Sequence, residues 1–239
     1  MLFALVHEMG HVFIAEMGLP VLGREEDAAD AHAVLVLLQV GDALSHGALV
    51  NTVKGWLVRE QRDRNRGDHG DKAAVYDEHG LNRERAYAIV CLMVGFDPEK
   101  FADLARDMHL PQERQQTCQA DYSNASWSWE RVLKPHRRAV IRPKTKIAAS
   151  YGDATGDMGI FAHLFRSIRM LETVADVAAE EYAWRRPFTL NMQTCGNPGA
   201  GWNTVNAQVR VCYEMATEFA QLYRGYVVSQ SETQILKRQ

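Results

Sequence analysis

The chain has 239 residues, 46% of them hydrophobic, and a formal net charge of −3. This length is enough to bury a substantial core in one large domain or in two small ones. The near-neutral charge gives no electrostatic reason to expect nucleic acid or an anionic membrane as a partner, and no apolar stretch reaches the roughly 18–20 residues of a membrane span.

The first predicted element is a helix over residues 1–17, which ends near Gly18 and carries the pattern His-Glu-x-x-His. On a helix, positions i and i+4 share a face, so His7 and His11 can bind one metal ion together. Glu8 lies on the flank of that face, where it can act as general base towards a water molecule. Two imidazoles and one carboxylate around an ion leave a fourth position open, which is typical of catalytic rather than structural zinc.

The residues around this pattern are mostly apolar, which predicts a largely buried helix in which unpaired histidines and glutamates would be costly. Gly10 costs about 1 kcal/mol relative to alanine in a helix, and this favours close approach of another backbone or a substrate. The alternative is a surface helix whose His7, Glu8 and His11 are merely solvated.

A second helix is predicted over residues 24–42. Its Glu26 is the predicted third metal ligand, with Glu25 as the rival. Asp30 follows Glu26 by four residues, so it can accept the second ring N–H of a metal-bound histidine and orient it. The alternative is an acidic first turn that complements the helix dipole.

The rest of the chain predicts more helices, then a few short strands, and the composition changes at Pro135. We therefore expect an α+β fold, mainly helical, with a 1–134 portion that carries the metal site. The 135–239 portion, a helix and a β-hairpin, is expected to pack onto it and complete one domain. Helices are predicted over 45–64, 82–94, 97–109 and 158–183, an initially helical and then irregular segment over 111–134, and strands over 145–151, 187–194 and 205–211, with a flexible connection over 196–201.

Four cysteines are present and no Cys-x-x-Cys pair, which argues against a cysteine zinc site. Cys195 and Cys212 could close the loop between two predicted strands, and Cys91 and Cys118 could bridge a helical segment. Four cysteines allow three pairings, and the alternative is four reduced, buried thiols.

His-Glu-x-x-His followed by a Glu-x-x-x-Asp helix resembles the gluzincin metallopeptidases. More narrowly, Leu19–Asp30 is similar to a family of uncharacterised, usually exported, bacterial metallopeptidases, as are Glu78–Leu81, Trp129 and the segment from Cys195 to Glu214. The resemblance implies a zincin-like fold with a small β-sheet, bound Zn²⁺, a peptide or protein substrate and disulfide bonds. It also implies that His79 stabilises the oxyanion, and the alternative is a loop histidine without a role. Tyr213, followed by Glu214, is the second candidate, and the alternative for Tyr213 is packing at a strand end.

The order of segments departs from that family, in which the cysteine-flanked segment precedes the metal-binding helix. Either the chain is N-terminally truncated, or it is circularly permuted, with a helix at 213–227 lying beside the one at 1–17. We favour permutation, because residues 143–227 supply the strands that the metal-binding helices would otherwise lack. A homodimer formed by domain swapping is a further expectation.

The predicted function is that of a zinc-dependent, metallopeptidase-like hydrolase. The alternatives are a catalytically inactive, zinc-stabilised binding module and a helical interaction domain without metal. The opening residues do not form a signal peptide, because no basic segment precedes them and His7 and Glu8 interrupt the apolar run. An exported protein, periplasmic or extracellular, would need a signal upstream, and without one the protein would be cytoplasmic.

Overall fold

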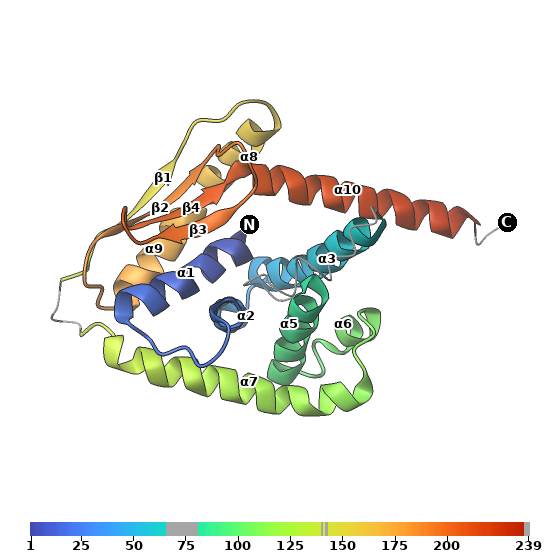
Figure 1. The fold of residues 1–239 in the computed structure, drawn as a ribbon, viewed down its shortest axis with the longest axis horizontal. Coiled ribbons are helices and arrows are strands. Elements are labelled where there is room, and N and C mark those ends of the chain that lie inside the picture. The colour runs from blue at the N-terminus through green and yellow to red at the C-terminus, as the bar shows by residue number, and fades with distance from the viewer. Residues whose placement is uncertain (66–80, 140, 142, 237–239) are drawn as a thin grey trace.

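The structure is a computed structural model that describes residues 1–65, 81–139, 141 and 143–236. It is mainly helical with one small sheet, as Figure 1 shows, so the predicted α+β class is confirmed. No described helix is both long enough and apolar enough to cross a membrane. The α-helices are α1 (Leu2–Met17), α2 (Glu25–Val40), α3 (Ala43–Asn65), α5 (Asn82–Phe96), α6 (Ala102–Asp107), α7 (Gln112–Leu133), α8 (Gly156–Ser167), α9 (Met170–Glu181) and α10 (Tyr213–Leu236), and η1 (Lys134–His136) is a short 3₁₀ helix.

The four described strands are β1 (Ile147–Tyr151), β2 (Phe188–Gln193), β3 (Ala200–Asn203) and β4 (Gln208–Cys212), in the order β1-β2-β4-β3. β1, β2 and β4 run parallel, and the outer strand β3 pairs antiparallel with β4. Leu190 and Val209 are fully buried on the inner face, whereas Ser150 and Arg210 are exposed on the other. α1 packs against β3 and β4 and α9 against β1 and β2, so one face of the sheet carries the core.

α1 lies between two hydrophobic cores. Leu5 and Met9 belong to the core shared with the sheet and α9. Phe3 and Val6, on another side of the same helix, belong to the core formed with α2, α3, α5, α6 and α7. A helix that is packed from both sides is held firmly, and this fixes the direction of the polar side chains between its apolar faces.

Several predicted elements differ from those observed. The helix expected over 158–183 is two helices, because Arg169 adopts a left-handed backbone (φ 53°) at the start of α9. α7 is helical to Leu133 rather than irregular, since its polar residues form an exposed outer face. β3 begins inside the segment expected to be a flexible connection, where pairing with β4 orders it. α10 leaves the sheet at the end of β4 and packs against α3 and α8, rather than along α1 (Figure 1).

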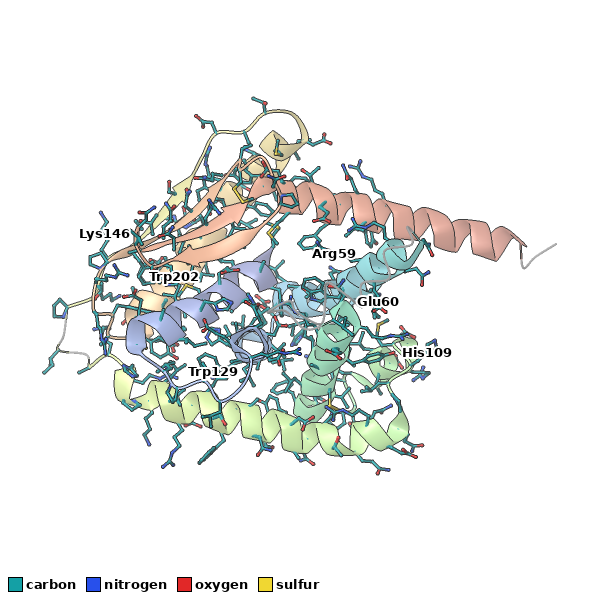
Figure 2. The ribbon with its side chains drawn as sticks, in the orientation of Figure 1. Arg59, Glu60, His109, Trp129, Lys146 and Trp202 are labelled. Carbon is teal, nitrogen blue, oxygen red and sulfur yellow. A yellow bond between two sulfur atoms is a disulfide. The ribbon has the colours of Figure 1, made fainter. Side chains whose placement is uncertain are left out.

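The tryptophans of α7 also differ from each other. Trp127 is 60% exposed. The ring of Trp129 lies 4.8 Å from that of His32 on α2. In Figure 2 the labelled Trp129 points from α7 towards α1 and α2, so it packs α7 against the two helices that carry the predicted ligands.

Two disulfides are present, and they correspond to one of the three possible pairings. Cys91–Cys118 joins α5 to α7, with the two Cα atoms 4.9 Å apart. Cys195–Cys212 joins the segment after β2 to the end of β4, with a Cα–Cα distance of 5.6 Å. No cysteine of the chain is left as a free thiol.

Gly95 allows close contact of α5 with α7 next to the first disulfide. The helix predicted over residues 82–94 is longer in the structure, because α5 continues through Gly95 to Phe96. A Cβ atom at position 95 would lie 2.1 Å from the carbonyl oxygen of Cys118 and 2.8 Å from Cβ of Tyr122. The two helices would have to move apart to accept it.

We therefore expect Gly95→Ala to lower the free energy of unfolding by about 2–3 kcal/mol, through overpacking. Equilibrium urea unfolding measures this change. The control is Gly55→Ala on α3, where a Cβ would meet nothing within 4 Å. That variant should be stabilised by up to about 1 kcal/mol, because alanine is the better helix former. Equal stability of the two variants would contradict the close contact.

Candidate metal centre

The metal centre predicted from the sequence lies where α1 crosses α2. The helices approach closely at Gly10, where a Cβ atom would lie 2.9 Å from Cα of Ala29. The backbone expected to approach Gly10 is therefore that of α2. A larger residue at either position would separate the helices, and with them the side chains at their crossing.

The three predicted ligands His7, His11 and Glu26 meet at this crossing. Nε2 of His7 lies 3.2 Å from Nε2 of His11 and 3.2 Å from Oε2 of Glu26. Oε1 of Glu26 lies 3.3 Å from Nε2 of His11. In a tetrahedral zinc site with bonds of about 2.0–2.1 Å, neighbouring ligand atoms are about 3.3–3.4 Å apart. The observed separations, which involve both oxygens of Glu26, are close to these values.

The other ring nitrogen of each histidine contacts a carboxylate. Nδ1 of His7 lies 2.8 Å from Oδ1 of Asp30, and Nδ1 of His11 lies 2.8 Å from Oε1 of Glu25. When Nδ1–H donates to a carboxylate, the lone pair of Nε2 faces the centre, ready to bind a metal. Asp30 thus contacts His7 as predicted. Glu25, the rival ligand, contacts the outer nitrogen of His11 instead.

The chemistry of this group of side chains fits a divalent cation. Two Nε2 lone pairs and a carboxylate converge on one point, and such acceptors repel one another unless a positive charge lies between them. Burial disfavours the charged form of His11, but hydrogen bonds that its ring donates to Glu26 and Glu25, together with the charge of Glu8, raise its pKa to about 9. Burial likewise opposes ionisation of His7, and its acidic neighbours still raise the pKa. The site therefore stabilises positive charge.

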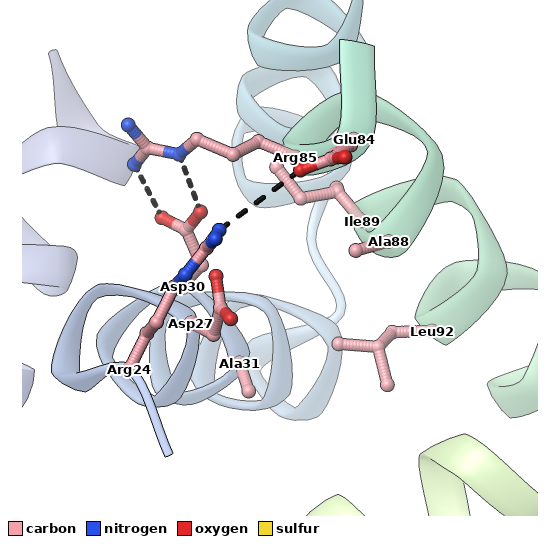
Figure 3. A pocket seen from close by; sticks show the side chains of 9 residues that line it. All are labelled: Arg24, Asp27, Asp30, Ala31, Glu84, Arg85, Ala88, Ile89 and Leu92. Carbon is pink, nitrogen blue, oxygen red and sulfur yellow. Dashed lines mark hydrogen bonds and ion pairs between the residues drawn. The ribbon is translucent and has the colours of Figure 1, made fainter. Parts of the chain in front are cut away.

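Arg85 on α5 is part of the site and was not predicted. Nε of Arg85 donates to Oδ2 of Asp30 at 2.7 Å, and its terminal nitrogen donates to Oδ1 at 2.8 Å (Figure 3). Burial would raise the pKa of Asp30, but hydrogen bonds from His7 and Arg85 lower it, so the carboxylate stays ionised. A charged side chain that is buried needs a partner of opposite charge. The signal in the sequence was therefore an arginine placed directly before the apolar run 86–94, where burial is expected.

The remaining predicted residues lie as follows. Glu8 is buried on α1, close enough for its charge to raise the pKa of both histidines. His79 falls in residues 66–80, outside the described part of the chain. Tyr213 is fully buried, and its hydroxyl donates to the carbonyl of Gly152, which indicates packing. Glu214 lies beside Cys195 and Cys212, but these sulfurs form the disulfide and are not available to a metal.

Searches among curated proteins and among solved structures gave no match. The sequence model of a family described as "Putative metallopeptidase" matches residues 1–133, which is more than half of the chain. The match includes α1, α2 and the whole candidate metal centre, and it ends before the sheet. The chain therefore belongs to this family.

Proposed function

We propose that the protein is a zinc-dependent hydrolase of peptide bonds in which His7, His11 and Glu26 bind the metal ion. The observation that carries the proposal is the convergence of these three side chains, each histidine with its second nitrogen against a carboxylate. Three protein ligands leave a position open for water or substrate, as in catalytic zinc sites.

The chemistry follows from the residues around the metal. Bound zinc would polarise the scissile carbonyl and make the attacking water more acidic. Glu8 accepts the proton of that water at its carboxylate and returns it to the leaving amine. Asp30 and Glu25 hold the histidines in the tautomer that leaves Nε2 free for the metal. His79 stays a predicted oxyanion donor.

The arrangement of α1 under the sheet supports a zincin-like binding mode for the substrate. β3 is one of the two outer strands of the described sheet, and it packs against α1. An outer strand can pair with an extended peptide through its backbone groups. A peptide bound along β3 would therefore run beside the helix that carries His7 and His11.

The shared packing of α1 supports one folding unit made from the 1–134 and 135–239 portions. The core around Leu5 and Met9 is completed by residues of the sheet, such as Leu190 and Val209. The two disulfides support an exported protein, because such bonds persist in oxidising compartments.

The second candidate function is a catalytically inactive, zinc-stabilised binding module. The family match favours it in one respect, since the match includes the metal centre but ends before the sheet that would hold a substrate. Such a module would bind zinc and gain stability from it, with no cleavage of peptides.

Elemental analysis after dialysis against zinc, followed by incubation with a random peptide library, tests the proposal. We expect about one zinc per chain and cleaved peptides. His11→Ala should lose both, whereas His163→Ala, at an exposed position on α8, should keep both. One zinc per chain without cleavage favours the binding module. Less than about one zinc per chain would favour the remaining hypothesis, a helical interaction domain that binds no metal.

A further inference from the structure

Arg85 is a deeply buried cation next to the candidate metal centre, and its position is fixed on two sides. Its side chain is 7% exposed and forms a forked pair with Asp30, itself 9% exposed. Its guanidinium also lies 4.3 Å from the ring centroid of Trp56 on α3. A planar guanidinium held by a carboxylate and an aromatic face has little freedom to turn.

The ion pair with Arg85 holds the carboxylate of Asp30 in one orientation. Oδ1 of Asp30 contacts both Nδ1 of His7 and a terminal nitrogen of Arg85, and Oδ2 accepts from Nε of Arg85. Rotation of the carboxylate would break at least one of these contacts. The direction of the His7 ring therefore depends on a residue of α5, 55 positions away from Asp30 in the sequence.

The second histidine lacks this support. Glu25, which contacts His11, has a side chain that is 49% exposed. Within the described part of the chain, the Glu25 side chain forms no other ion pair or hydrogen bond. An exposed carboxylate is free to move in solvent, so it holds its partner less firmly than a buried, doubly bound one.

We propose that Arg85 is a positioning residue, which fixes Asp30 and through it the His7 ring, and so sets the affinity of the centre for zinc. The inference rests on the proposed function, because it takes His7 as a zinc ligand. It adds a determinant on α5 to a centre whose ligands all lie on α1 and α2. Loss of partners behind metal ligands weakens binding by about 10–100-fold.

The test is a double-mutant cycle on the full chain, with the zinc Kd measured by competition with a chelator. Arg85→Met should raise the zinc Kd by about 10–100-fold. In an Asp30→Asn background the same change should alter it by less than about threefold, because Arg85 acts through Asp30. The Co²⁺-substituted protein should show a changed visible spectrum in Arg85→Met, since the spectrum reports ligand geometry.

Arg138→Met is the matched control. Its side chain is 8% exposed and pairs with Glu180, far in the sequence from the metal ligands. The Arg138→Met protein also loses a buried arginine, so we expect its stability to fall. Its zinc Kd and Co²⁺ spectrum should stay as in the wild type. Should Arg85→Met not fold, Arg85→Lys replaces it, because lysine keeps the charge but cannot form the fork. We then expect the zinc Kd to rise less than in Arg85→Met, by up to about 10-fold.

The outcomes separate this inference from the proposed function. A wild-type protein that binds no zinc would refute both. Wild-type zinc binding with an unchanged Kd in the Arg85 variant would refute the positioning role alone. An equal loss in the Asp30→Asn background would do the same, because it would show an effect that does not pass through Asp30.

Discussion

Glu8→Gln is expected to lower kcat for peptide hydrolysis by about 10²–10⁴-fold, the usual contribution of a general base. Glutamine has nearly the same shape but cannot accept the proton of the attacking water. The three predicted metal ligands are untouched, so zinc should stay at about one per chain. Steady-state kinetics on a cleaved peptide, together with elemental analysis of the same sample, measures both quantities.

The matched control is Glu16→Gln on the same helix. Glu16 forms a forked ion pair with Arg186, at the end of α1 opposite to the first turn. This variant should retain kcat, because its carboxylate supports packing of α1 and has no part in the reaction. A Glu8→Gln enzyme with the wild-type kcat would refute the general-base assignment, whatever its zinc content.

Removal of zinc is expected to lower the melting temperature by about 10 °C. A ligand at about 1,000 times its Kd stabilises the folded state by about 4 kcal/mol, and 1 kcal/mol shifts Tm by about 2–4 °C in a chain of this size. The metal-free protein also has to hold the Nε2 lone pairs of His7 and His11 and the Glu26 carboxylate close together, and their repulsion lowers its stability further. Thermal unfolding with excess zinc and after dialysis against a chelator measures the shift.

His11→Ala is the control for a specific effect, because it removes one predicted ligand from the α1–α2 crossing. Its melting temperature should be the same with and without zinc. A zinc-dependent shift that persists in His11→Ala would place the stabilising ion elsewhere in the chain. That result would count against the centre even if the wild-type protein binds zinc.

The sequence could predict what depends on spacing within one helix. His7 and His11 share a face, as do Glu26 and Asp30, because 3.6 residues complete a turn. These local relations were enough to predict the two helices and the side chains that meet at their crossing. They were also enough to predict that Asp30 contacts a histidine.

Only the tertiary structure shows which faces pack together, because such contacts depend on the whole core rather than on neighbours in the chain. Arg85 reaches Asp30 only because α5 packs against α2. The choice among three cysteine pairings, the outer strand β3 and the break at Arg169 depend on packing in the same way. The amino-acid sequence by itself determined the candidate ligands, whereas the fold decided what holds them in place.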